Sequence, residues 1–260
     1  MTHPYAIWPL RFSPDPAGMI DFYSRLGLHQ SLSHEAGTFA TFVGRSGALG
    51  VHDARTTMAG PVPGHAALNL ATSDLEAAAA ELTGIGHEVR LWDETYGKQG
   101  VVVARDGRAI GLNQERQEDL YGGYHERAVT RVPLLDVVAV CSTPDPRAEA
   151  VWFASFGFVA PSYDDPWWIG LRAGAQSGVL GIHAGGIDAR KPRPADDVLG
   201  TAYEVKIGFE TPEPLVELDE RLRTAGLEPL TITDGPQPRI LLTDPDGDEV
   251  QIHPAPGDDS

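Results

Sequence analysis

The chain has 260 residues, a length suited to two domains of about 130 residues each. Hydrophobic residues make up 42% of the composition and charged residues 22%, so the chain can bury real cores and does not resemble a disordered segment. The net charge of −17 repels phosphate backbones and anionic membrane surfaces, which argues against nucleic-acid binding and membrane attachment.

Cysteine content and the hydrophobic pattern bear on the compartment. Cys141 is the only cysteine, so no disulfide forms within the chain and no thiolate zinc site is expected. The first segment, MTHPYAIWPLRFSPDP, lacks a basic start followed by an apolar run, and no stretch of about 18 apolar residues occurs. These features predict a cytoplasmic protein.

The first quarter of the chain predicts a strand, a helix and a further strand. The run AIWPLRF is strand-like and leads into the turn SPDP at Ser13–Pro16. The segment Ala17–Leu28 has helical spacing of its apolar residues, and SGALGVH at Ser46–His52 has the character of a strand.

The second quarter predicts a strand and a helix followed by three strands. The segment His65–Asp74 is strand-like. Leu75, Ala78 and Leu82 then fall on one helical face, in a run whose alanine and glutamate content favours helix. The runs HEVRLWDE, QGVVVARDGR and AIGLNQE predict three short strands separated by glycine and aspartate.

The third quarter repeats the first. The strand-like run LLDVVAVCS leads into the turn TPDP, the helical segment Arg147–Phe158 and the strand SGVLGIH. Asp145 follows Asp15 by 130 positions, and His183 follows His52 by 131. Two landmarks with nearly the same offset predict that the chain is a tandem duplication.

The last quarter repeats the second. It contains the strand AYEVKIGFET, a helix with Leu215, Leu218 and Leu222 on one face, and the strands EPLTITD, RILLTDPDGD and EVQIHPA. Alternating strands and helices are also compatible with a doubly wound parallel sheet. The trailing strands, however, are joined by tight turns such as DPDGD, which require antiparallel neighbours. The pattern therefore predicts an α+β fold of four βαβββ modules.

Three of these motifs carry a family resemblance. DPAGMIDFYSRLGL, SDLEAAAAELTGIGHEV and LLTDPDGDEVQIH are similar to landmarks of the vicinal oxygen chelate superfamily, which includes glyoxalases, bleomycin-resistance proteins and extradiol dioxygenases. The resemblance covers nearly the whole chain. It implies that the modules pair into two glyoxalase-like domains, first with second and third with fourth, each a U-shaped mixed sheet flanked by helices. The implied parts are an N-terminal domain over 1–117 (modules 1–62 and 63–117), a linker over 118–132 and a C-terminal domain over 133–256 (modules 133–198 and 199–256).

The resemblance also implies where a metal would be bound. Metal enzymes of the superfamily hold a divalent ion with His, Gln or Glu from the first and last strands of the paired modules, and such ligands suit Fe, Mn, Ni or Zn. In the N-terminal half these positions fall on Trp8, Ala67 and Gly111, and none of these side chains can ligate a metal. No metal site is therefore expected in this half.

In the C-terminal half the match is partial. Val138 occupies one ligand position, and Lys206 or Glu204 another, depending on the register. Gln251 falls where a glutamate is usual, and His253 lies two residues further along the same strand face. No metal is favoured here either. The alternative is a divalent metal held by Glu204, Gln251 and His253.

Two histidines end equivalent strands, His52 in the first half and His183 in the second. Since histidine titrates near neutrality, either could be a general base, and His183 a further metal ligand. The other interpretation is a strand-end histidine that hydrogen-bonds a loop. Asp53 follows the first and Ala184 the second, so no shared carboxylate partner supports catalysis. We assign no catalytic residue from the sequence.

Aromatic side chains favour ligand binding instead. The family resemblance implies that Trp8 faces the cavity, and core packing is the alternative for Trp8 and for one of Trp167 and Trp168. Trp152, on a predicted helix, is expected to pack in the core. Trp167 and Trp168 are consecutive, so one faces each side of their strand. Aromatic walls with a few polar groups are typical of small-molecule sites. The predicted ligand-binding residues are Trp8, Asn69, Asn113, Trp167, Trp168 and Lys206.

This combination resembles the bleomycin-resistance branch, whose members sequester a ligand without chemistry. The sequence thus predicts a metal-free protein that binds a hydrophobic or aromatic small molecule, in a resistance or sequestration role. The alternative is a metal-dependent lyase or dioxygenase in the C-terminal domain. A third possibility is that one half is purely structural. Since one chain already contains two U-shaped sheets, we expect a monomer or a homodimer.

Overall fold

The computed structural model describes most of the chain. The described residues are 4–56, 63–94, 97–115, 122–128, 132–160, 167–185, 195–196, 200–233 and 237–256. Within them, no helix combines the length and the apolar character needed to cross a bilayer.

In the N-terminal half the elements follow the predicted order. One sheet has six strands in the order β11-β3-β4-β5-β2-β6, and the other has five in the order β1-β7-β10-β9-β8. The elements are β1 (Ala6–Ile7), β2 (Leu10–Ser13), α1 (Pro16–Leu26), β3 (His29–His34), β4 (Phe39–Val43), β5 (Ala48–Asp53), β6 (His65–Ala67), β7 (Asn69–Thr72), α2 (Leu75–Gly84), β8 (Val89–Glu94), β9 (Gly97–Val103), β10 (Ala109–Gln114) and β11 (Tyr124–Glu126).

Two of the predicted strands are each broken into two. AIWPLRF forms β1 and β2, separated by Trp8 and Pro9, and proline cannot donate a ladder hydrogen bond. The strand that begins at His65 breaks at Leu68, whose N–H donates to the carbonyl of Tyr203 at 2.7 Å. β1 pairs with β7 and β2 with β6, both antiparallel, so the edge strands β1 and β6 lie where the chain passes from one sheet of this half to the other.

The C-terminal half is built on one sheet of seven strands, in the order β13-β14-β12-β17-β20-β19-β18. Its centre is the antiparallel pair β12 and β17, so the third and fourth modules share this sheet. The elements are β12 (Asp136–Thr143), α3 (Pro146–Phe153), the 3-10 turn η1 (Ala154–Phe156), β13 (Trp168–Leu171), β14 (Val179–Ala184), β15 (Ala195–Asp196), β16 (Gly200–Thr201), β17 (Lys206–Thr211), α4 (Leu215–Thr224), β18 (Leu230–Ile232), β19 (Arg239–Thr243) and β20 (Glu249–Pro254).

The predicted linker over 118–132 contains a strand. β11 pairs antiparallel with β3 and forms the edge of the six-stranded sheet. Further backbone bonds flank it, from Glu35 N to Gly123 O and from Arg127 N to Ser31 O, both at 2.8 Å. This part of the linker therefore belongs to the N-terminal sheet. The domain boundaries at 117 and 133 stay a prediction.

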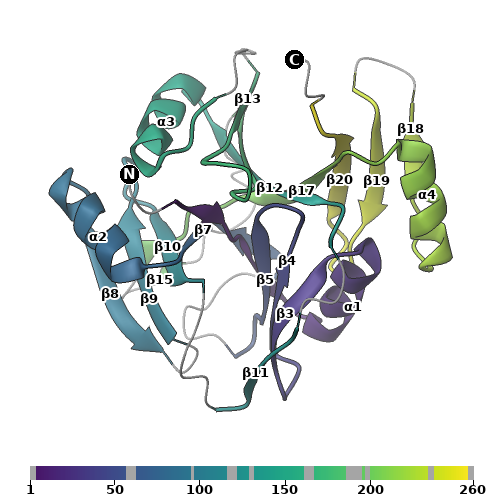
Figure 1. Cartoon of the computed structure of the whole chain (residues 1–260), viewed down its shortest axis with the longest axis horizontal. Coiled ribbons are helices and arrows are strands. Elements are labelled where there is room, and N and C mark those ends of the chain that lie inside the picture. The colour runs from purple at the N-terminus through teal and green to yellow at the C-terminus, as the bar shows by residue number, and fades with distance from the viewer. Residues whose placement is uncertain are drawn as a thin grey trace.

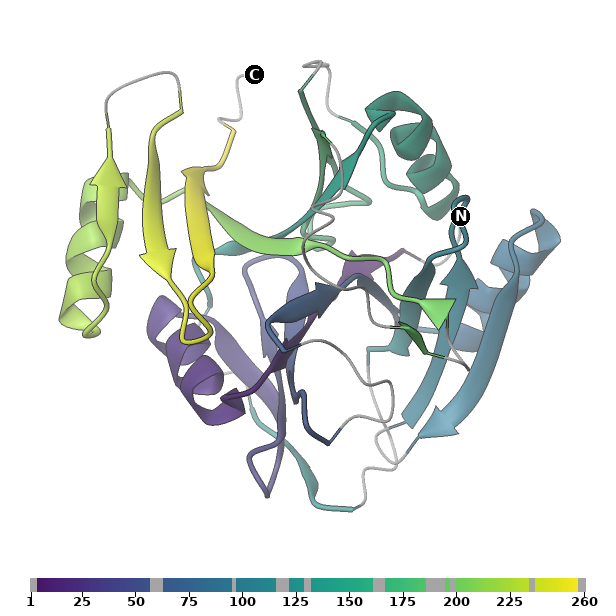
Figure 2. The same cartoon turned by 180° about the vertical axis from the view of Figure 1, so that it is seen from behind.

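The two halves lie back to back. In each half the strands form a strongly curved surface, and the concave faces of the two halves open in opposite directions (Figure 1). Helices α1 and α4 lie on one flank, and α2 and α3 on the other, as both views agree (Figure 2). Arg221 of α4 donates to the carbonyl of Leu26 at the end of α1 (3.0 Å), and His87 Nε2 lies 2.9 Å from Ser155 Oγ on the opposite flank.

A hydrophobic core of described residues runs through both halves. Tyr23 of α1 packs edge-on against Phe209 of β17, with ring centroids 6.3 Å apart. Gly47 and Gly178 bring the two backbones together, since a Cβ on Gly47 would lie 2.9 Å from the Gly178 Cα. The predicted α+β architecture with curved mixed sheets flanked by helices is confirmed.

Candidate functional site

The concave face of the N-terminal half carries a wall of aromatic side chains. Trp8, Leu10 and Phe12 alternate toward this face, and a Cβ on Gly50, opposite Leu10, would lie 3.6 Å from the Trp8 indole. The Phe12 ring lies 6.0 Å from the imidazole of His52, the residue opposite it on β5. The Trp8 indole therefore lies on the same strand face as Leu10 and Phe12.

Strand β11 extends this wall. Phe39 lies 5.8 Å from the His52 ring and 5.7 Å from the Tyr124 ring, both edge-on. Tyr124 in turn meets the His34 ring at 4.7 Å. His34 is fixed by its neighbours, because its Nδ1 accepts from Ala36 N (3.1 Å) and its Nε2 donates to the carbonyl of Gly122 (2.9 Å). A segment of the predicted linker thus completes the wall.

Carboxamides line the opposite part of the same face. Asn69 pairs with Gly111, and Asn113 with Gln99, across adjacent strands. Gln99 Nε2 donates to Asn113 Oδ1 at 2.8 Å. Trp8 N donates to the carbonyl of Asn69 at 2.7 Å, which joins the aromatic and amide parts. Trp8, Asn69 and Asn113 therefore share one concave face.

His52 is held neutral within this wall. Burial is the main cause and lowers the pKa of the imidazole, although the neighbouring Asp53 opposes the shift. His52 Nδ1 donates to the Asp53 carbonyl at 2.9 Å. Among the described residues, the hydrogen-bond partner of the His52 ring is a backbone carbonyl and not a carboxylate, which fits the interpretation as a strand-end histidine. Its counterpart His183 is solvent-exposed.

The concave face of the C-terminal half is built around Trp168. Its indole lies over Gly181 and occupies the space that a Cβ there would take. Trp167, the preceding residue, is 68% exposed. Lys206 faces the same side as Gly181, because each pairs with Val140, and its exposed ammonium makes no ion pair within the described part of the chain.

Buried charges on this face compensate one another. Asp136 accepts from Ser46 Oγ (2.8 Å) and lies 2.5 Å from Arg45 and 3.3 Å from Arg172. Arg172 also pairs with Glu210 at 2.9 Å. Burial raises the pKa of the Glu210 carboxyl more than Arg172 lowers it. Since Arg45 and Ser46 come from the N-terminal half, this network ties the halves together.

The proposed metal ligands of the C-terminal half are not brought together. Gln251 and His253 are adjacent on one face, with His253 Nε2 3.0 Å from Gln251 Oε1. Glu204 instead pairs with Ala67 of the other half, and its Oε2 lies 3.3 Å from Nε2 of the buried His65. Glu204 is four residues, or about 13 Å of extended chain, from Gly208, where an added Cβ would lie 3.2 Å from the Gln251 carbonyl oxygen.

The remaining positions do not fit a divalent metal either. His183 pairs with Ser142, four residues along β12 from Val138, which is the apolar residue at the ligand position. In the N-terminal half, the Asn69 carboxamide fills the Cβ space of Gly111, where the superfamily's glutamate would stand. Across the described ranges, no group of three or more His, Cys, Asp or Glu side chains could hold a metal ion.

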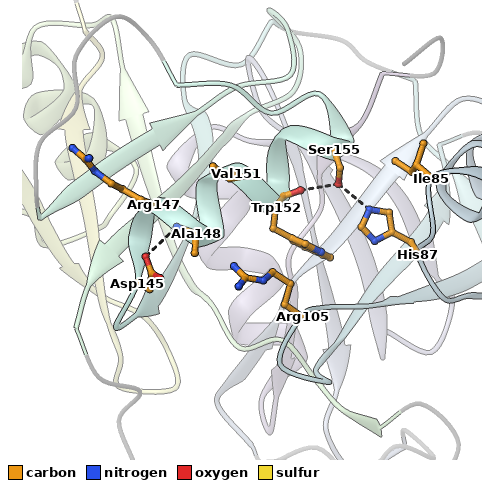
Figure 3. A pocket seen from close by; sticks show the side chains of 9 residues that line it. All are labelled: Ile85, His87, Arg105, Asp145, Arg147, Ala148, Val151, Trp152 and Ser155. Atoms are coloured by element: carbon orange, nitrogen blue, oxygen red, sulfur yellow. Dashed lines mark hydrogen bonds between the residues drawn. The ribbon is translucent and has the colours of Figure 1, made fainter.

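A hollow of about 790 Å³ lies outside both concave faces, on the α2 and α3 flank (Figure 3). Ile85 and His87 come from the segment after α2, and Arg105 from the turn between β9 and β10. Trp152 and Ser155 come from α3 and η1 of the other half. No sequence pattern predicts this hollow, because its residues come from separate segments that only the packing of the halves brings together.

Phe12, Phe39 and Tyr124 of the aromatic wall are not among the residues predicted from the sequence. For Phe12 a signal existed, since Trp8, Leu10 and Phe12 alternate with a period of two. No such signal marked Tyr124. The sequence predicts Trp152 in the core; its ring packs against Phe156, with the ring centroids 4.8 Å apart, and the residue also lines the hollow.

Comparison with known proteins gives structural matches only. No family model matches the sequence, and no curated protein matches it. The Mn(II)-bound glyoxalase from Novosphingobium aromaticivorans matches 96% of this chain and 80% of its own, with a TM-score of 0.55 and 12% identity. Homoprotocatechuate 2,3-dioxygenase from Arthrobacter globiformis matches 97% of this chain and 79% of its own, with a TM-score of 0.54 and 16% identity.

A further match is a xylose isomerase-like TIM barrel/4-hydroxyphenylpyruvate dioxygenase fusion protein. It covers 97% of this chain and 48% of its own, with a TM-score of 0.59 and 13% identity. At such identities the likeness establishes the fold and leaves the activity to be argued from the site.

Proposed function

The chain has the fold of the vicinal oxygen chelate superfamily, and from that premise we propose that it binds a small aromatic molecule on the concave face of its N-terminal half. The observation that carries the proposal is the aromatic wall of Trp8, Phe12, Phe39 and Tyr124, which shares that face with a set of carboxamides. Aromatic walls with a few placed polar groups are what small-molecule sites usually offer.

The polar groups on this face favour an uncharged ligand. Asn69, Asn113 and Gln99 offer carboxamide donors and acceptors without a net charge. His52 adds no charge at neutral pH, because burial lowers the pKa of its imidazole. A neutral ring with a hydroxyl, carbonyl or amide substituent matches this set. Retention of such a molecule without chemistry corresponds to the sequestration or resistance role inferred from the sequence.

The neutral fluorescent probe N-phenyl-1-naphthylamine tests this site. We expect its emission to rise on binding to the full chain, and Trp8→Leu to weaken binding at least tenfold while the circular dichroism spectrum is unchanged. Trp167→Leu is the matched control, since Trp167 is 68% exposed and lies in the other half. Equal affinity of Trp8→Leu and the unaltered protein would place the ligand elsewhere.

A second candidate function is a metal-dependent lyase or dioxygenase, with the metal in the C-terminal half. Its support is the Mn(II)-bound glyoxalase and the dioxygenase among the structural neighbours, together with the adjacent Gln251 and His253. Against it stand Val138 and Lys206 at the other ligand positions. Dialysis against Mn(II), followed by elemental analysis, separates the two. Stoichiometric metal that is lost in Gln251→Ala would favour the enzyme over the binding protein.

We further propose that the chain is a tandem duplication, and two reciprocal hydrogen bonds support this. Ile7 N donates to Ser177 O (2.8 Å), and Val137 N donates to Ser46 O (3.0 Å). Val137 follows Ile7 by 130 positions, and Ser177 follows Ser46 by 131. Equivalent residues thus exchange bonds across the halves, as two copies would in a symmetric dimer. A monomer would then hold both concave faces.

A further inference from the structure

The hollow between α2 and α3, which we call the seam hollow, is open to solvent and is lined by apolar, aromatic and charged side chains. Its volume of about 790 Å³ falls within the range of small-molecule pockets, roughly 300 to 1,000 Å³. Apolar side chains stand open to solvent at its edge, with Ile85 58% and Val151 75% exposed. The Trp152 indole is half-buried and presents a flat surface between them (Figure 3).

The charge of the seam hollow comes from arginine. Arg105 is exposed and forms no ion pair within the described part of the chain, although the chain as a whole has 17 excess negative charges. Arg105 and Trp152 both line the hollow, and Figure 3 shows that the Arg147 side chain extends away from the indole. Asp145 brings one negative charge to the far edge, where it caps α3 through Ala148 N at 3.1 Å.

The imidazole of His87 is uncharged and helps to position the Trp152 indole. Burial lowers the pKa of His87, so its ring is neutral at pH 7. Ser155 Oγ donates to the Trp152 carbonyl (2.7 Å) and so accepts from His87 Nε2 (2.9 Å). The His87 ring meets Trp152 edge-on at 5.5 Å. These contacts fix the indole, which is thereby preorganised as a stacking surface.

We propose that the seam hollow is a second ligand site, which binds a small aromatic molecule carrying one carboxylate. The aromatic ring of the ligand lies on Trp152 among Ile85 and Val151, and its carboxylate pairs with Arg105. An arginine guanidinium recognises a carboxylate through two parallel hydrogen bonds, which an uncharged substituent cannot reproduce. This site is separate from the proposed site on the N-terminal concave face and differs from it in requiring a charge.

The matched probes 1-naphthoate and 1-naphthalenemethanol test the proposal by calorimetric titration of the full chain. We expect 1-naphthoate to bind at least tenfold more tightly than the alcohol. Arg105→Gln should abolish that preference, while Trp152→Leu should weaken both ligands. Asp145→Asn, which keeps the helix cap, should tighten 1-naphthoate about twofold or more by removing the nearby negative charge.

Arg147→Gln is the control for Arg105→Gln, because it removes the same charge from the side chain that extends away, and we expect less than a twofold change. Trp8→Leu should leave 1-naphthoate binding unchanged, which separates this site from the N-terminal concave face. The proposal would be overturned by failure of 1-naphthoate to bind. It would equally be overturned if Arg105→Gln and Arg147→Gln lowered the affinity by the same factor, or if the alcohol bound as tightly.

Discussion

Burial governs the chemistry of Cys141, the only thiol of the chain. Its side chain is fully buried, and burial raises the thiol pKa to about 12. The nearby Tyr203 hydroxyl donates to Glu149, and the Arg108 guanidinium lies 3.8 Å above the Tyr203 ring. The polar groups around the thiol are therefore paired with one another, and the reactive thiolate is absent near neutral pH.

We predict that Cys141 resists 5,5′-dithiobis(2-nitrobenzoate) at pH 8 in the folded protein and reacts with one equivalent in guanidinium chloride. The unfolded thiol has a pKa of about 8.5. Because the folded pKa is higher, the contribution of this group to stability is full below about pH 8.5 and is lost as the pH rises toward 12. Absorbance at 412 nm measures the reaction. Equally rapid labelling of folded and unfolded protein would contradict the assigned burial.

Which side chains share a face was predictable from the sequence, and which segments become neighbours was not. Period-two alternation depends only on the strand geometry, and Trp8, Asn69 and Asn113 do lie on one face of their sheet. Their role in ligand binding stays a prediction. Glu204 was grouped with Gln251 by the same logic. The segment before β17, however, leaves its own sheet to pair with β6, which brings Glu204 to His65. That outcome depends on how the halves pack.

At the scale of elements, matching aspartates start two helices. Asp15 accepts from Gly18 N at the start of α1, and Asp145 accepts from Ala148 N at the start of α3, both at 3.1 Å. In each case proline occupies the first helical position, where its missing N–H costs nothing. The SPDP and TPDP motifs thus predicted the helix starts within about one residue.

We predict that Asp145→Ala lowers the free energy of unfolding by about 1 kcal/mol, since it removes the oxygen that satisfies an orphan N–H of α3. Asp145→Asn should cost only a few tenths of that, because asparagine is an equally good cap. Urea titration followed by circular dichroism measures both variants. If the two lost the same stability, the charge of Asp145 and not its capping bond would be the stabilising feature.

The breaks in strands were less predictable than the helix starts. Pro9 explains the interruption between β1 and β2, and the sequence displayed it. Leu68 carries no such signal, because its N–H leaves the ladder to reach Tyr203 of the other half. The strand β11 likewise forms because β3 offers an open edge to the passing chain. Local propensity is weak where a distant segment supplies the hydrogen bonds.

At the scale of the whole molecule, a buried charge cluster joins the halves. Arg11 of β2 is 7% exposed and extends into the DPDGD turn that precedes β20. Its guanidinium donates hydrogen bonds to Asp244 (3.0 Å), Asp246 (3.0 Å) and Asp248 (2.8 Å) of this turn. Ser13 Oγ adds a bond to Asp246 at 2.8 Å. The turn motif was visible in the sequence, but its partner lies more than 230 residues away along the chain.

We predict that Arg11→Gln lowers the free energy of unfolding by about 3 to 5 kcal/mol at pH 7, because it leaves buried carboxylates without their counter-charge. Burial already raises the pKa of Asp244 more than Arg11 lowers it, so loss of Arg11 raises it further. A raised folded pKa means that ionisation opposes folding. The loss should therefore shrink as the pH falls from 7 toward 5 and the carboxyl takes up its proton.

Arg25→Gln is the control for this measurement. Arg25 pairs with Asp21 at 2.8 Å, but both side chains are about half exposed, so we expect a loss below about 1 kcal/mol at either pH. Urea titrations of both variants and of the unaltered protein at pH 7 and pH 5 give the four differences in the free energy of unfolding. Because the core is continuous across the halves, each variant should still unfold in one transition. Two separate transitions in Arg11→Gln alone would show that this cluster, rather than the core, couples the halves.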